Sequence, residues 1–94
     1  MPRYLVDRDF GQISDEDMQE FAAVAGTLIN ERFSDIVWEG SRTCNDVDGG
    51  IKSFCVYQAP NPERLIEHAE AVGVPATHRV YEIVGDIDPN DIKT

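Results

Sequence analysis

Two helix-type hydrophobic patterns, each followed by a strand-type pattern, constrain this chain more than any other feature of its sequence. In the first, apolar residues recur at gaps of three and four between Met18 and Phe33, which predicts a helix over residues 15–32. The second follows Pro62, which suits the first helical position, and ends at Gly73, which suits a helix C-terminus. Each predicted helix has one apolar side, so both need a common surface to cover.

That surface is predicted by four strand-type segments. They are rich in β-branched and aromatic residues, are bounded by turn-forming residues, and cover 3–8, 35–44, 51–59 and 78–84. The run at 45–50 is a turn by composition, so the two middle segments form a hairpin. If the hairpin arms are symmetric about this turn, Trp38 lies near Tyr57 and Gly40 lies near Cys55.

The resulting order, β-α-β-β-α-β, is the split βαβ pattern of the ferredoxin-like fold. We therefore expect an α+β domain in which a four-stranded antiparallel sheet carries both helices on one face. The open face needs a cover. We expect Trp38, Cys55 and Tyr57 on this face if the other apolar residues of the hairpin, Val37, Phe54 and Val56, point toward the helices. The simplest cover is a second copy about a two-fold axis, which gives a homodimer of the dimeric α/β-barrel type.

Charge is the least ordinary bulk property of the chain. Eight lysines and arginines oppose eighteen acidic residues, which gives a net charge of −10. A field of this sign repels phosphate backbones and anionic membranes, so we expect no nucleic acid and no membrane as partner, whereas divalent cations are attracted. Solubility alone also explains such a surface. Along the chain we expect a ferredoxin-like domain at residues 1–85 and an acidic, polar tail at 86–94.

The expected compartment follows from the N-terminus and the cysteines. Residues 1–10 carry four charges and no apolar run of the kind found in a secretion signal. No stretch approaches the roughly 20 apolar residues of a membrane helix. We therefore expect a cytoplasmic protein in which Cys44 and Cys55 are free thiols, although both fall in neighbouring predicted strands.

No established catalytic motif is present, so the sequence leans away from an enzyme without excluding one. The candidate metal ligands are His68, which borders the apolar side of the second helix, and Cys55, His78 and Glu82. His78 and Glu82 share one strand face about 13 Å apart, so this pair cannot chelate one ion directly. A structural interpretation stays open for each: a histidine bonded to a backbone carbonyl, a small core cysteine, or a solvated side chain.

Four segments together resemble a known family. They are residues 2–6, 52–63, 68–69 and 73–76, and the most specific is the run Phe-Cys-Val-Tyr-Gln-Ala-Pro-Asn-Pro within the second. The chain resembles a small bacterial family that was long catalogued as a domain of unknown function and is described as nickel-binding, ferredoxin-like proteins. The resemblance covers nearly the whole chain to Val84.

The resemblance implies a ferredoxin-like homodimer and surface binding of nickel(II), with His68 as the best single candidate ligand. Two histidines are few for a nickel site, because imidazole is the natural ligand of this ion. By analogy of fold, the alternative is a small-molecule binder or a cofactor-independent isomerase or monooxygenase-like enzyme. In that case Trp38, Tyr57, Cys55 and His68 line a pocket between sheet and helices, and His68 is the base. A plain structural or interaction domain is the third hypothesis.

Overall fold

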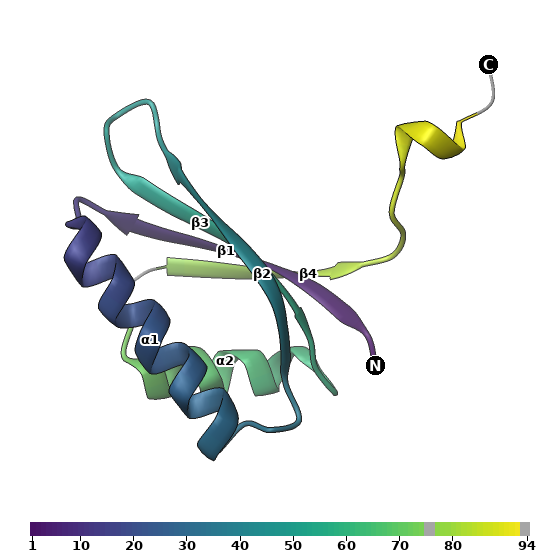
Figure 1. Cartoon of the computed structure of the whole chain (residues 1–94), viewed down its shortest axis with the longest axis horizontal. Helices are drawn as coiled ribbons and strands as arrows, with labels where there is room; N and C mark the ends of the chain where they lie inside the picture. Colours follow the sequence, from purple (N-terminus) through teal and green to yellow (C-terminus); the bar gives the residue numbers. More distant parts are fainter. Residues whose placement is uncertain (75–76, 93–94) are drawn as a thin grey trace.

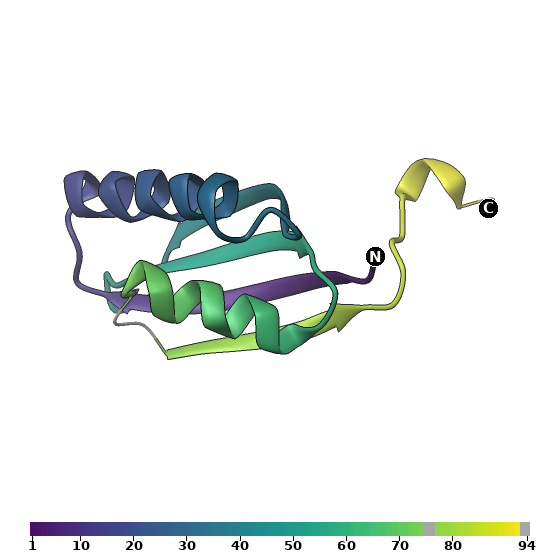
Figure 2. The same cartoon turned by 90° about the horizontal axis from the view of Figure 1, so that it is seen from below.

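The structure is a computed structural model, and it describes residues 1–74 and 77–92. Its elements are β1 (Arg3–Gly11), α1 (Asp15–Glu31), β2 (Val37–Asn45), β3 (Ile51–Gln58), α2 (Pro62–Val72), β4 (Thr77–Ile83) and the single 3-10 turn η1 (Pro89–Asp91). The strands form one antiparallel sheet in the order β2-β3-β1-β4. Both helices lie on the same side of this sheet (Figures 1 and 2). The predicted α+β, split βαβ fold is confirmed.

The helix ends are where local chemistry places them. Ser14 precedes α1, and its hydroxyl accepts a hydrogen bond from the Asp17 amide at 3.1 Å. Asn61 caps α2 in the same way, with its side-chain oxygen accepting from the Arg64 amide at 2.9 Å. Gly73 ends α2 with φ of 79°, a left-handed conformation that glycine adopts without strain. Pro75 and Ala76, which belong to the family-like segments, lie outside the described residues.

The strand pairing contains two register shifts that the sequence did not predict. Trp38 lies opposite Tyr57 as predicted, but a bulge at Glu39 places Gly40 opposite Val56 rather than opposite Cys55. At the other end of the sheet, β1 is longer than predicted. A second bulge lets Gly11 pair with Ile51, so β1 extends beyond the predicted segment 3–8.

The assignment of residues to the two sides of the sheet was wrong. Trp38, Cys55 and Tyr57 lie under the helices, and Phe54 and Val56 lie on the open side. The cause is that β3 is apolar at both odd and even positions, so its alternation alone does not choose a side.

The neighbouring strand decides between the two sides. In β1, Tyr4 and Val6 are buried and pair with Tyr57 and Cys55, whereas Leu5 pairs with Val56. We call the side under the helices the inner face; it carries Tyr4, Val6, Arg8, Ser53, Cys55 and Tyr57. We call the opposite side the outer face; it carries Arg3, Leu5, Glu39, Arg42, Phe54 and Val56.

The core sits between the inner face and α2, with a smaller contribution from α1. Leu65 and His68 of α2 are fully buried, whereas Ala25 is the one buried residue of α1. The remaining residues of the core cluster come from the sheet, from the connection after α1, which supplies Phe33 and Ile36, and from the connection after β3, which supplies Ala59. The shallow seating of α1 leaves space between this helix and the sheet.

The C-terminal segment extends away from the body of the domain (Figure 1). Its tie to the sheet is an ion pair between the Arg3 guanidinium and the Asp86 carboxylate at 2.6 Å. Val84 and Ile87 are almost fully exposed on it. No helix in the part of the chain that the structure describes is long and apolar enough to cross a bilayer.

Candidate functional site: the two faces of the sheet

A cavity of about 80 Å³ lies between α1 and the inner face. Strands β1, β2 and β3, helix α1 and the end of α2 all contribute to its walls, which are mostly apolar. Trp38, Tyr57 and Cys55, which the sequence suggested for a pocket, all line it, together with Arg8. His68 is not among the lining residues.

Tyr57 is the centre of the aromatic packing on the inner face. Its ring stacks on Trp38 with centroids 6.1 Å apart and meets the His68 ring edge-on at 6.1 Å. Burial raises the pKa of the Tyr57 hydroxyl far above its ordinary value, with a further rise from Cys55, while the Arg8 guanidinium opposes the rise. Tyr57 therefore stays a neutral hydroxyl at physiological pH.

His68 is fully buried, and its contacts fill the space around it. Its Nε2 lies 3.0 Å from the Ala25 carbonyl oxygen, which can only accept, so Nε2 carries the proton and donates. Phe33 packs edge-on against the ring at 5.2 Å. Burial lowers the pKa of His68, and the cationic Arg8 and Arg64 lower it further, whereas the bond to Ala25 opposes them. The geometry is that of a neutral histidine joining α2 to α1.

Arg8 is the unusual residue of the inner face. It is 4% exposed, and its Nε and Nη2 are buried without a hydrogen-bond partner in the part of the chain that the structure describes. The register places it between Ser53 on β3 and His78 on β4. A buried guanidinium normally has an acidic partner, because desolvating a charge is costly.

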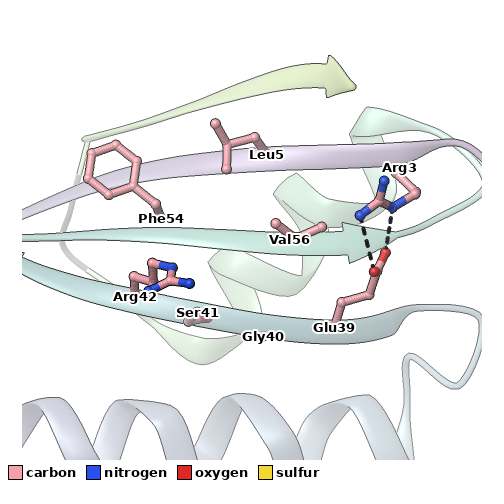
Figure 3. A pocket seen from close by; sticks show the side chains of 8 residues that line it. All are labelled: Arg3, Leu5, Glu39, Gly40, Ser41, Arg42, Phe54 and Val56. Atoms are coloured by element: carbon pink, nitrogen blue, oxygen red, sulfur yellow. Dashed lines mark hydrogen bonds and ion pairs between the residues drawn. The ribbon is translucent and has the colours of Figure 1, made fainter. Parts of the chain in front are cut away.

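The outer face carries a larger and shallower groove, of about 430 Å³ (Figure 3). Leu5, Phe54 and Val56 form its apolar floor, and polar side chains stand at its ends. At one end the Arg3 Nε donates to the Glu39 carboxylate at 2.8 Å. This bond lowers the pKa of the Glu39 carboxyl.

The structure separates the four predicted metal ligands. His68 and Cys55 are buried on the inner side, whereas His78 is half-buried and Glu82 exposed on β4. Within residues 1–74 and 77–92, no three His, Cys, Asp or Glu side chains gather closely enough to hold an ion. Cys44 and Cys55 are both free, one exposed and one buried.

Arg8 is the site residue that sequence reasoning missed: it is the last residue of the predicted strand 3–8 and is not among the candidate site residues. A signal was present in the alternation of β1. Arg8 has the same parity as Tyr4 and Val6, which are the residues that turn inward.

Comparison with known proteins identifies the family. Residues 4–83 match the family described as "Nickel responsive protein SCO4226-like". The chain belongs to this family. No curated protein sequence matches the chain.

Solved structures extend the likeness to the fold. SCO4226 from Streptomyces coelicolor A3(2) is 15% identical, with a TM-score of 0.67 over 90% of this chain and 99% of that one. The C-terminal domain of the MgtC protein from Mycobacterium tuberculosis is 18% identical, with a TM-score of 0.64 over 87% of each chain. Ribosomal protein S6 from Thermotoga maritima is 8% identical, with a TM-score of 0.62 over 87% of each chain. Identities this low establish the fold alone.

Proposed function

We propose that this chain is a homodimeric binding protein that takes up divalent nickel at a surface site. The observation that carries the proposal is the match of residues 4–83 to a family described as nickel responsive. The net charge of −10 supports it, because such a field concentrates divalent cations near the surface.

The outer face is the proposed dimer contact. Leu5, Phe54 and Val56 form an apolar floor that no helix covers, and Val37 and Tyr81 on the edge strands are each 45% exposed. A contiguous apolar surface of this kind is typical of an interface in a small protein. A two-fold axis would bring the same floor of a second copy onto it.

The C-terminal segment supports the same proposal. Val84 and Ile87 are 95% and 86% exposed on a segment that leaves the body of the domain. The Arg3–Asp86 ion pair holds the start of this segment beside the outer groove. Apolar side chains in that position fit the surface of a second copy better than they fit water.

The placement of the two histidines leaves one of them available as a nickel ligand. The Nε2 of His68 is bonded to a carbonyl inside the domain, which leaves the half-buried His78 as the accessible imidazole. Nickel favours imidazole over carboxylate, and carboxylates alone bind it weakly. We propose His78 as the imidazole ligand of the ion; its pairing with Arg8 puts it on the inner side of the sheet, on the edge strand β4 and outside the proposed outer-face dimer contact.

The dimer is tested by light scattering of the purified chain and of two matched variants. We expect a mass twice the 10.5 kDa of one chain for the wild type, and a monomer for Val56→Asp on the outer face. Val24→Asp, on the exposed side of α1, is the control and should remain a dimer. A wild type that stays monomeric at high concentration would remove the dimer from the proposal.

Nickel binding is tested by calorimetric titration of protein free of any polyhistidine tag. Nickel chloride should give saturable heat at micromolar protein, and His78→Ala should weaken binding at least about tenfold, because it removes the accessible imidazole. Glu82→Gln should weaken it less, and magnesium, which prefers oxygen ligands, should give little heat. No heat with nickel at micromolar protein would refute nickel binding whatever the oligomeric state.

A further inference from the structure

The buried Arg8 supplies no ligand to the proposed nickel site, although His78 is its neighbour on β4. Arg8 is 4% exposed, and two of its nitrogens have no partner among the described residues. All eighteen acidic residues belong to the described part of the chain, yet none of the ion pairs in that part includes Arg8. The chain therefore buries a cation, in a molecule of large negative charge, without supplying its counter-ion.

The cavity next to Arg8 has the character of a ligand site. Its walls combine the guanidinium with the small polar side chains of Ser53 and Thr43, and the remainder is largely apolar, including Phe21 and Trp38. No acidic residue lines it. A guanidinium presents its donors in a planar fork that matches a carboxylate, and apolar walls suit a short hydrocarbon chain.

The size of the cavity limits the ligand. Its 80 Å³ is about half of the roughly 150 Å³ cavity that accommodates benzene. A purely inorganic anion would satisfy Arg8 but would leave the aromatic walls without contacts. We propose that the cavity between α1 and the sheet binds a short-chain monocarboxylate of about three to five carbons, whose carboxylate pairs with Arg8.

The single tryptophan gives a direct readout. Trp38 lines the cavity, and its indole nitrogen donates to the Ser41 hydroxyl at 2.8 Å. Titration with sodium butyrate should change the Trp38 fluorescence saturably and raise the melting temperature. Butyramide, which has nearly the same shape without the charge, and inorganic phosphate, which has charge without the chain, should give no saturable change.

Two variants at matched arginines test the pairing. Arg8→Met keeps the apolar bulk and should weaken butyrate binding by about ten- to a hundredfold, the value of a charge-assisted hydrogen-bonded pair. This variant should fold at least as well as the wild type, because it removes an unpaired buried charge. Arg42→Met removes an arginine whose side chain lines the outer groove and not the cavity, and this variant should bind butyrate like the wild type.

Several results would overturn the proposal. These are the absence of a saturable response to butyrate in folded protein, unchanged butyrate affinity in Arg8→Met, and equal responses to butyrate and phosphate. Light scattering of Arg8→Met should match the wild type, and its nickel titration should still give saturable heat, because His78 is retained. The failure of the cavity proposal is therefore distinguishable from the failure of the proposed nickel-binding dimer.

Discussion

The inner and outer faces of the sheet carry similar apolar residues, but helices cover these residues only on the inner face. Along β3, Cys55 and Tyr57 are at most 4% exposed, while Phe54 and Val56 between and beside them are only half-buried. Both pairs are apolar, so composition does not distinguish the faces. The difference lies in what covers them: two helices on the inner side, and none on the outer side (Figure 2).

The two faces also differ in whether their arginines have acidic partners. On the outer face, Arg3 pairs with Glu39 and Asp86, both within 2.8 Å. On the inner face, Arg8 of the same strand has no acidic partner in the described residues. Water solvates the guanidinium of an exposed arginine but not that of a buried one. An arginine on the outer face therefore needs no further partner, whereas a buried arginine on the inner face needs an anion to pair with.

The largest expected difference between the faces is in thiol reactivity. Cys44 is exposed, whereas Cys55 is 4% exposed on the inner face. A disulfide reagent should modify Cys44 promptly and Cys55 only after the core opens, a difference on the order of a thousandfold or more in rate. Cys44→Ser and Cys55→Ser assign the two phases. Equal rates for both thiols would mean that the inner face is not covered as described.

The next effect compares two valines on neighbouring strands. Val6 is fully buried on the inner face, and Val56 is half-buried on the outer face. Val6→Ala should lower the free energy of unfolding by about 2–3 kcal/mol, because it removes two buried methyl groups and leaves a cavity. Val56→Ala should cost less than about 1 kcal/mol within one chain.

Urea unfolding at low protein concentration measures both valine variants while limiting any contribution from dimer formation. The slope of free energy against urea should stay the same, since neither change alters the extent of unfolding. Equal losses for the two variants would break the distinction between the faces.

The elements of this fold could be predicted from sequence because their signals are local. Ser14, Asn61 and Gly73 mark helix ends by hydrogen bonds and backbone conformations within a few residues. The order of the elements then selects one topology. The family resemblance, which rests on short runs around residues 52–63 and 68–69, led to the same fold.

The faces and the site could not be predicted in the same way, because they depend on pairing between distant residues. The side taken by Tyr57 depends on its pairing with Tyr4, which lies 53 positions earlier, as the register shows. The bulge at Glu39 shifts part of β2 by one residue, which no composition signal indicates. The lack of an acidic partner for Arg8 among the described residues becomes visible only once the structure gives the positions of the acidic side chains.

The smallest expected effect is a pH dependence from the inner face. Burial lowers the pKa of His68, so the unfolded chain takes up this proton near the ordinary histidine value of about 6.5 and the folded chain only at lower pH. Below about pH 6.5 the unfolded state therefore binds more protons, and the free energy of unfolding falls as pH falls, by at most about 1.4 kcal/mol per pH unit for one group. The fall ends once the pH is below the folded pKa.

Asp35 and Glu39 do not contribute to the change in stability between pH 7 and pH 5.5. Hydrogen bonds from Arg64 and Arg3 lower the pKa of Asp35 and of Glu39, so the stability linked to these groups is present above the ordinary carboxyl values near 4 and is lost only below them. Urea unfolding of the wild type at pH 7 and pH 5.5 should thus show a loss that His68→Gln, which keeps a donor for Ala25, largely removes. His78→Gln on β4 should keep the loss. If His68→Gln shows the same loss as the wild type, the proton is taken up elsewhere, and the inner face is not the pH-sensitive side of the sheet.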